Sequence, residues 1–76
     1  MQNANQTLDA RGLNCPLPIL RTRKSLGAML SGEILELIAT DPGSVRDIDA
    51  FCKQTGDQLL STTDVSGEYH FMIRKA

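Results

Sequence analysis

The stretch Ile34-Leu35-Glu36-Leu37-Ile38-Ala39 decides the fold of this chain, because five of its six residues are apolar. A near-continuous apolar run of this length predicts an interior strand that is flanked on both sides. A helical pattern of apolar residues precedes the run over residues 16–29. A second helical pattern follows it over residues 44–55, so the chain alternates between helix and strand around its centre.

Each of these two helices has one apolar side. In the first helix that side is expected to carry Ile19, Leu20, Leu26, Gly27 and Leu30. In the second helix it is expected to carry Val45, Ile48, Phe51, Cys52 and Thr55. The second helix has two possible starts. One is a capping-box pattern of Ser44 with Asp47, and the other places Pro42 at the first helical position after Asp41. Gly56 is its natural stop.

Three further strand patterns complete the chain. Residues 7–10 precede the first helix, and residues 59–63 and 68–74 follow the second, with a hairpin turn at Ser66-Gly67. The order strand, helix, strand, helix, strand, strand predicts an α/β two-layer sandwich. In it, both helices cover one face of a four-stranded mixed sheet. The other face is expected to carry residues such as Ile34, Ile38, His70 and Met72.

Length and composition narrow the classes of function. The chain has 76 residues, 41% of them apolar, and a formal net charge of −1. This length predicts one domain, residues 6–76, behind a disordered tail, residues 1–5. A domain this small has little room for a buried cavity, so its chemistry is expected at the surface. The near-zero charge argues against direct nucleic acid binding, and the short apolar runs argue against a membrane span. The polar N-terminus lacks the features of a signal peptide, which predicts a cytoplasmic protein.

The motif that points to chemistry is Asn14-Cys15-Pro16-Leu17-Pro18, at the start of the first helix. Cys15 is expected at the N-cap position, with Pro16 as the first helical residue and Pro18 as the third. The partial positive charge of a helix N-terminus favours the thiolate, which lowers the pKa of a cysteine there and raises its reactivity. Cys15 is therefore the predicted functional residue, and the two prolines stiffen its presentation.

The charge around the motif supports this prediction. Residues 10–30 contain no acid and four cations, namely Arg11, Arg21, Arg23 and Lys24. These four side chains are candidates for binding a partner or an anion. Arg23 has two interpretations, because it projects toward the apolar side of the helix. Either its stem covers apolar surface while its guanidinium pairs with a carboxylate such as Asp47, or it binds a partner or an anion.

The second cysteine, the single histidine and the spacing of the motif argue against a dithiol site and against a metal site. Cys52 falls on the apolar side of the second helix and is expected to be an inert core residue. Since position 18 is a proline, the chain has no Cys-x-x-Cys dithiol, and Cys15 must act singly as a nucleophile or carrier. Two cysteines and one histidine cannot supply a four-ligand metal site, and no cofactor is expected. A dyad of Cys15 with His70 is a minor alternative.

The sequence resembles the TusA/SirA/YedF family of sulfur carriers over nearly its whole length beyond Asn5. The positions that carry the resemblance are Leu8-Asp9, Gly12-Leu13-Asn14-Cys15-Pro16-Leu17-Pro18, Arg23-Lys24, Gly32-Glu33, Asp41-Pro42, Asp47-Ile48 and Ile73-Arg74-Lys75. The resemblance implies a sulfurtransferase that acts in a sulfur relay. Cys15 would accept sulfane sulfur as a persulfide, and Pro16 and Pro18 would complete its motif. Leu17 occupies a slot where the family commonly carries an acidic residue.

The resemblance also implies the kind of partner. The donor would be a cysteine desulfurase or a rhodanese-like protein, and the acceptor a downstream sulfur carrier. In the family such relays serve tRNA thiolation or dissimilatory sulfur oxidation. The free protein is expected to be a monomer. Two alternatives stay open: a non-enzymatic regulatory module that binds a partner through its sheet face, and a thiol redox sensor that uses Cys15.

Overall fold

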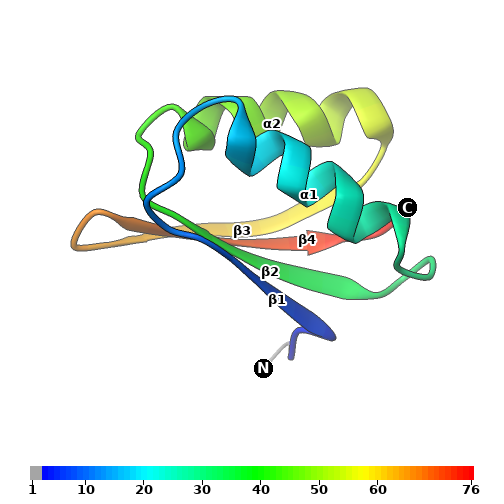
Figure 1. Ribbon diagram of the computed structural model, residues 1–76. Helices are drawn as coiled ribbons and strands as arrows, with labels where there is room; N and C mark the ends of the chain where they lie inside the picture. The colour runs from blue at the N-terminus through cyan, green and yellow to red at the C-terminus, as the bar shows by residue number, and fades with distance from the viewer. Residues whose placement is uncertain (1–2) are drawn as a thin grey trace.

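The computed structural model describes residues 3–76 as two layers, with both helices lying against the same face of one sheet (Figure 1). The elements, in chain order, are β1 (Gln6–Ala10), α1 (Leu17–Gly27), β2 (Ile34–Ala39), α2 (Ser44–Thr55), β3 (Gln58–Val65) and β4 (Glu68–Arg74). The predicted βαβαββ two-layer sandwich is confirmed.

The sheet has the strand order β1-β2-β4-β3, so β2 is an interior strand as predicted. It runs parallel to β1 and antiparallel to β4, and Leu37 of β2 pairs with Leu8 on one side and Phe71 on the other. Side chains of β2 are alternately half-buried and buried, because one face of the strand lies under the helices and the other is open. The same alternation in β4 confirms that His70 and Met72 lie on the open face.

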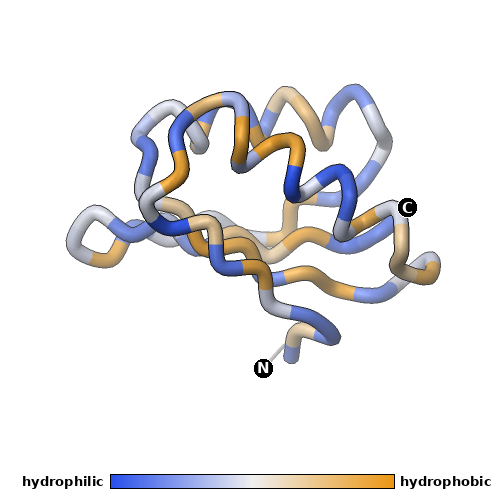
Figure 2. The backbone as a smooth tube through the Cα atoms, viewed as in Figure 1, coloured by the Kyte–Doolittle hydropathy of each residue, from blue (hydrophilic) through white to orange (hydrophobic). Residues whose placement is uncertain are grey.

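The core lies between the helices and the sheet. Its largest fully buried apolar side chains are Phe71, Leu26, Leu35, Leu37, Ile48 and Ile73. In Figure 2 hydrophobic segments of the tube lie in the strands and in parts of both helices. Among residues 3–76, six buried apolar residues belong to strands and four to helices, so both layers contribute to the core.

Helix α1 buries a different stripe from the one that its apolar residues predicted. Its buried residues are Pro18, Thr22 and Leu26, while Leu20 is 52% exposed. The spacing of four residues aligns these three positions along one helix face. The Thr22 hydroxyl donates a hydrogen bond of 2.7 Å to the Pro18 carbonyl oxygen, which satisfies it inside the core. The predicted placement of Leu20 was wrong, as was that of Leu30, which is 74% exposed beyond the end of the helix.

Helix α2 begins at Ser44, with Gly43 as a cap that makes no side-chain hydrogen bond. The predicted capping box was wrong, because Asp47 makes no capping hydrogen bond. In the rival start, Pro42 precedes the helix instead of beginning it, but Oδ1 of Asp41 accepts the Gly43 N–H at 3.2 Å, as the side chain of a capping residue does. Gly56 ends the helix as predicted, because its φ of +84° is the left-handed conformation that glycine adopts at low cost. Val45 is exposed, although the sequence placed it on the apolar side.

The hairpin turn between β3 and β4 is as predicted, because Ser66 and Gly67 both have positive φ, which a two-residue turn requires. β3 contains an irregularity between Leu59 and Ser61. At the N-terminus, the backbone N–H of Asn5 donates a hydrogen bond to the Ile34 carbonyl oxygen, so contact with the sheet begins within the predicted tail. Residues 1–2 of that tail lie outside the described part of the chain. Among residues 3–76 no helix is long and apolar enough to cross a membrane.

Candidate functional site: a thiol groove between two helices

Cys15 lies in the loop between β1 and α1, and its side chain is exposed. The helix begins at Leu17 and Pro16 is its N-cap residue, so Cys15 precedes the cap. The sequence had placed Cys15 at the cap and Pro16 inside the helix, one position too early. Pro18 is thus the second helical residue and is buried. The peptide bond between Cys15 and Pro16 is cis.

The loop that carries Cys15 is tied to the loop that follows β2. The Cys15 backbone N–H donates a hydrogen bond of 2.9 Å to Oδ2 of Asp41, whose Oδ1 accepts the Gly43 N–H at 3.2 Å. The Gly12 N–H donates to the Thr40 hydroxyl at 2.9 Å. The two loops meet because β1 and β2 are parallel and end in register. Sequence reasoning missed this role of Asp41, since its short-range pattern also fits a helix cap.

The thiol opens into a shallow groove of about 230 Å³ between α1 and α2. The residues that line it are Cys15, Pro16, Ile19, Arg23, Asp47, Ala50, Phe51 and Gln54. Its apolar members come from both helices, and its polar groups are a thiol, a guanidinium, a carboxylate and an amide. We call it the thiol groove.

The electrostatic setting of Cys15 differs from the prediction. Its pKa lies above the ordinary value for a thiol, chiefly because the side chain contacts the carboxylate of Asp47. Partial desolvation acts in the same direction, and so do the charges of Asp47 and Asp41. The expected lowering of the pKa was therefore wrong. Asp47 comes from α2, so that no reading of the segment around Cys15 could have included it.

Arg11, one of the four candidate cations, is engaged elsewhere. Its guanidinium pairs with Asp9 at 3.0 Å and with Glu68 at 3.5 Å. The hydrogen bond from Arg11 lowers the pKa of the Asp9 carboxyl to about 2. Two carboxylates, one from β1 and one from β4, therefore hold the charge of Arg11, and Arg11 does not line the thiol groove.

The other three cations divide between two places. Arg21 and Lys24 line a hollow on the exposed side of α1, together with Leu17 and Leu20. Arg23 lies in the thiol groove, with its guanidinium carbon 5.3 Å from the centre of the Phe51 ring. This is a cation–π contact with the stem laid over apolar surface. No ion pair among residues 3–76 joins Arg23 to Asp47, so the first interpretation is right about the stem and wrong about the carboxylate.

The second cysteine and the histidine lie away from the thiol groove. Cys52 is 5% exposed within the core, which confirms its predicted place, and burial raises its pKa to about 11. His70 stands on the open sheet face, with Nδ1 3.5 Å from Glu36 and Nε2 3.6 Å from Glu68. The alternative dyad of Cys15 with His70 is therefore wrong.

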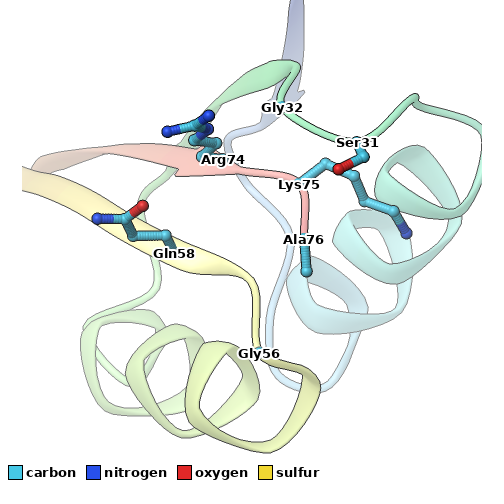
Figure 3. Close-up of a pocket in the computed structure, with 7 residues that line it drawn as sticks. All are labelled: Ser31, Gly32, Gly56, Gln58, Arg74, Lys75 and Ala76. Carbon is cyan, nitrogen blue, oxygen red and sulfur yellow. The ribbon is translucent and has the colours of Figure 1, made fainter.

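A second hollow lies where both helices end, at the opposite end of α1 and α2 from Cys15. It is lined by Ser31, Gly32, Gly56, Gln58, Arg74, Lys75 and Ala76. The side chains of Arg74 and Lys75 point away from each other (Figure 3), so they do not form one anion site. Within residues 3–76, no group of three or more His, Cys, Asp or Glu side chains is placed to hold a metal ion.

Comparison with known proteins shows the family of the chain. The model of the family Sulfurtransferase TusA matches residues 6–75. The chain is 58% identical to the Sulfur carrier protein TusA of Allochromatium vinosum, over the full length of both. It is 45% identical to the Sulfur carrier protein TusA of Pseudomonas entomophila, covering 91% of this chain and 86% of that one. The crystal structure of a SirA-like protein from Desulfitobacterium hafniense has the same fold, with a TM-score of 0.80 at 22% identity, covering 91% of this chain and 95% of that one. The chain belongs to the TusA family of sulfur carriers.

Proposed function

We propose that this protein carries sulfane sulfur as a persulfide on Cys15, between a donor protein and an acceptor protein. The observation that carries the proposal is one exposed thiol at the mouth of the thiol groove, whose backbone N–H is held by Asp41. A surface thiol is open to exchange with a thiol of a larger protein, which a buried thiol is not. The carrying unit is residues 6–76, and it acts in the cytoplasm.

The proposed transfer needs no oxidant. The Cys15 thiolate attacks the terminal sulfur of a donor persulfide, a new sulfur–sulfur bond forms on Cys15, and the donor's own sulfur–sulfur bond breaks. The donor leaves as a thiolate and takes up the proton that Cys15 has lost. Delivery repeats the exchange, with the acceptor thiolate attacking the terminal sulfur on Cys15. Each step moves one sulfur atom and leaves the number of thiols and persulfides unchanged.

The supporting residues have proposed roles as well. Pro16 and Pro18 hold the sulfur-bearing loop at the start of α1. Arg21 and Lys24, on the exposed side of α1, supply positive charge for docking partners beside the exposed Leu20. The donor is a cysteine desulfurase or a rhodanese-like protein, and the acceptor is a further carrier in tRNA thiolation or in sulfur oxidation. The free carrier is a monomer.

The raised pKa of Cys15 favours this function over a redox sensor. Sensor cysteines have a low pKa, because peroxide reacts with the thiolate. Asp47 acts in the opposite direction. A carrier depends less on the pKa of this thiol, because in the delivery step the nucleophile is the acceptor thiolate and not Cys15.

The test is to incubate the protein with glutathione persulfide and to measure its intact mass. The expected product is heavier by one sulfur atom and returns to the starting mass on reduction. Cys15→Ser should gain no labile sulfur, whereas the matched control Cys52→Ala should load like the wild type. If Cys15→Ser still acquires the sulfur, or if the wild type acquires none, the proposal is wrong. Retention of cellular function by Cys15→Ser would instead favour the regulatory module.

A further inference from the structure

The hollow on the exposed side of α1 has the shape of a helix-packing site. It has a volume of about 460 Å³ and is lined by Leu17, Leu20, Arg21 and Lys24. Counted from Leu17, these are positions i, i+3, i+4 and i+7 of one helix, which are neighbours around a single gap on the helix surface. In knobs-into-holes packing, such a gap receives one side chain of a facing helix. The hollow therefore fits a helix that lies along α1.

The two halves of this hollow differ in chemistry. Leu17 and Leu20, at the end nearer to Cys15, are 42% and 52% exposed. Arg21 and Lys24 each follow one of these leucines by a turn of the helix, and both are exposed. Covering a half-exposed leucine is favourable, because it removes apolar surface from water. A facing helix must therefore offer an apolar side chain at one end of the hollow and groups that suit two cations at the other.

The carboxylates that would suit these cations are not supplied by the chain itself. None of the ion pairs among residues 3–76 includes Arg21 or Lys24. Of the nine acids in the chain, every one except Asp47 already has an ion pair or accepts a hydrogen bond within the described part. Asp47 lines the thiol groove, away from this hollow. A second copy of the chain thus has little free negative charge to offer, and a different protein is the better source.

We propose that the hollow is the docking site for an acidic amphipathic helix of a partner protein, which sets an apolar side chain over the two leucines and carboxylates against Arg21 and Lys24. The inference rests on the proposed function, because it names the chemistry by which a sulfur donor or acceptor recognises the carrier.

The position of the hollow suits such a partner. Helix α1 begins at Leu17, two residues after Cys15, so a helix seated on the hollow lies close to the sulfur-bearing loop. The thiol groove is lined by other residues of α1, Ile19 and Arg23. Docking therefore leaves the groove open, so that the reactive residue of the partner can reach the sulfur.

A lipid surface suits the hollow less well than a protein helix does. A helix that lies on a membrane needs a broad apolar face. The exposed side of α1 offers two leucines, since Pro18, Thr22 and Leu26 are buried within the protein. The formal net charge of −1 gives the whole chain no attraction to anionic lipids.

The test is an NMR titration of the isotope-labelled protein with a synthetic helical peptide that carries Glu at positions i and i+3 and Leu at i+4 and i+7. Shifts of backbone amides should centre on α1. The double variant Arg21→Glu/Lys24→Glu should bind about tenfold more weakly, because two exposed ion pairs are replaced by repulsion. Leu20→Ser should bind about fivefold more weakly, since less apolar surface is covered. Arg46→Glu is the matched control, an exposed cation of α2 outside the hollow, and should bind like the wild type.

A second peptide, with Lys in place of both Glu residues, separates charge recognition from apolar contact and needs only the wild-type protein. It should bind at least about tenfold more weakly than the acidic peptide. Equal binding of the two peptides, or shifts centred outside α1, would overturn the proposal even if the variants do not fold.

Two other occupants of the hollow are tested on the wild type. Shifts of the α1 amides with vesicles of equal parts phosphatidylglycerol and phosphatidylcholine, and none with the acidic peptide, would assign the hollow to a membrane and overturn the proposal. Concentration-dependent dimerisation that Leu20→Ser abolishes would assign it to a second copy, with the same consequence. The titration uses the carrier without sulfur, so its failure is distinguishable from failure of the mass experiment that tests the proposed function.

Discussion

The surroundings of Cys15 and of Cys52 raise the pKa of both thiols, but for different reasons. At Cys15 the main cause is a carboxylate beside an exposed sulfur. At Cys52 it is burial in the core, where the side chain is 5% exposed. A shift caused by a neighbouring charge can be reversed by neutralising that charge. A shift caused by burial persists until the chain unfolds. The comparison shows why only one of the two thiols is suited to exchange.

The largest effect expected from this comparison is in accessibility. In the folded protein at pH 8, alkylation of Cys15 should exceed that of Cys52 by at least about a thousandfold, because Cys52 reacts only when the core opens and small domains unfold at a cost of about 5 kcal/mol or more. Peptide mass mapping after timed exposure to iodoacetamide measures the ratio. In denaturant the two rates should become similar. Comparable rates in the folded state would show that Cys52 is not a core residue.

A second prediction concerns stability at high pH. The pKa of Cys52 is raised to about 11, so the unfolded chain, with an ordinary thiol pKa of about 8.5, loses this proton first as the pH rises. Cys52 therefore contributes no pH dependence below about pH 8.5, and above it lowers the free energy of unfolding by at most about 3 kcal/mol near pH 11.

Denaturant titrations at pH 8 and at pH 10.5 measure this effect. Cys52→Ala should lose less stability between the two pH values than the wild type does. Cys15→Ser is the comparison variant and should keep most of the decline. If Cys52→Ala is as sensitive to alkaline pH as the wild type, burial of the thiol is not what raises its pKa.

The smallest effect concerns the contact that joins the two regions, the guanidinium of Arg23 over the ring of Phe51. Arg23→Gln removes the cation and should lower the free energy of unfolding by about 0.5 kcal/mol, as expected of an exposed cation–π contact. Arg21→Gln, on the opposite side of the same helix, should leave it unchanged. Thermal or urea unfolding of both variants measures the difference. Equal losses would mean that the Arg23 contact does not stabilise the fold.

Several elements were predictable because their signals are local. The bounds of β2 and β4 match the predicted ranges, since alternating or continuous apolar residues set the extent of a strand. The stop of α2 at Gly56 and the turn at Ser66-Gly67 follow from backbone conformations that those residues adopt at low cost. The buried stripe of α1 was not predictable, because it depends on a threonine whose hydroxyl is satisfied by the Pro18 carbonyl within the helix.

The sequence by itself determined the order of the elements, the two-layer fold, and the candidacy of Cys15 over Cys52. Those properties depend on apolar periodicity and on one short motif. Only the tertiary structure decided the charge around the sulfur. Asp41 and Asp47 reach Cys15 from elements that follow β2, while Arg11 is drawn to Glu68, 57 residues away. Coulombic interactions depend on distance in space, so the helix N-terminus and the cations near Cys15 along the chain together predicted the wrong sign for its pKa shift.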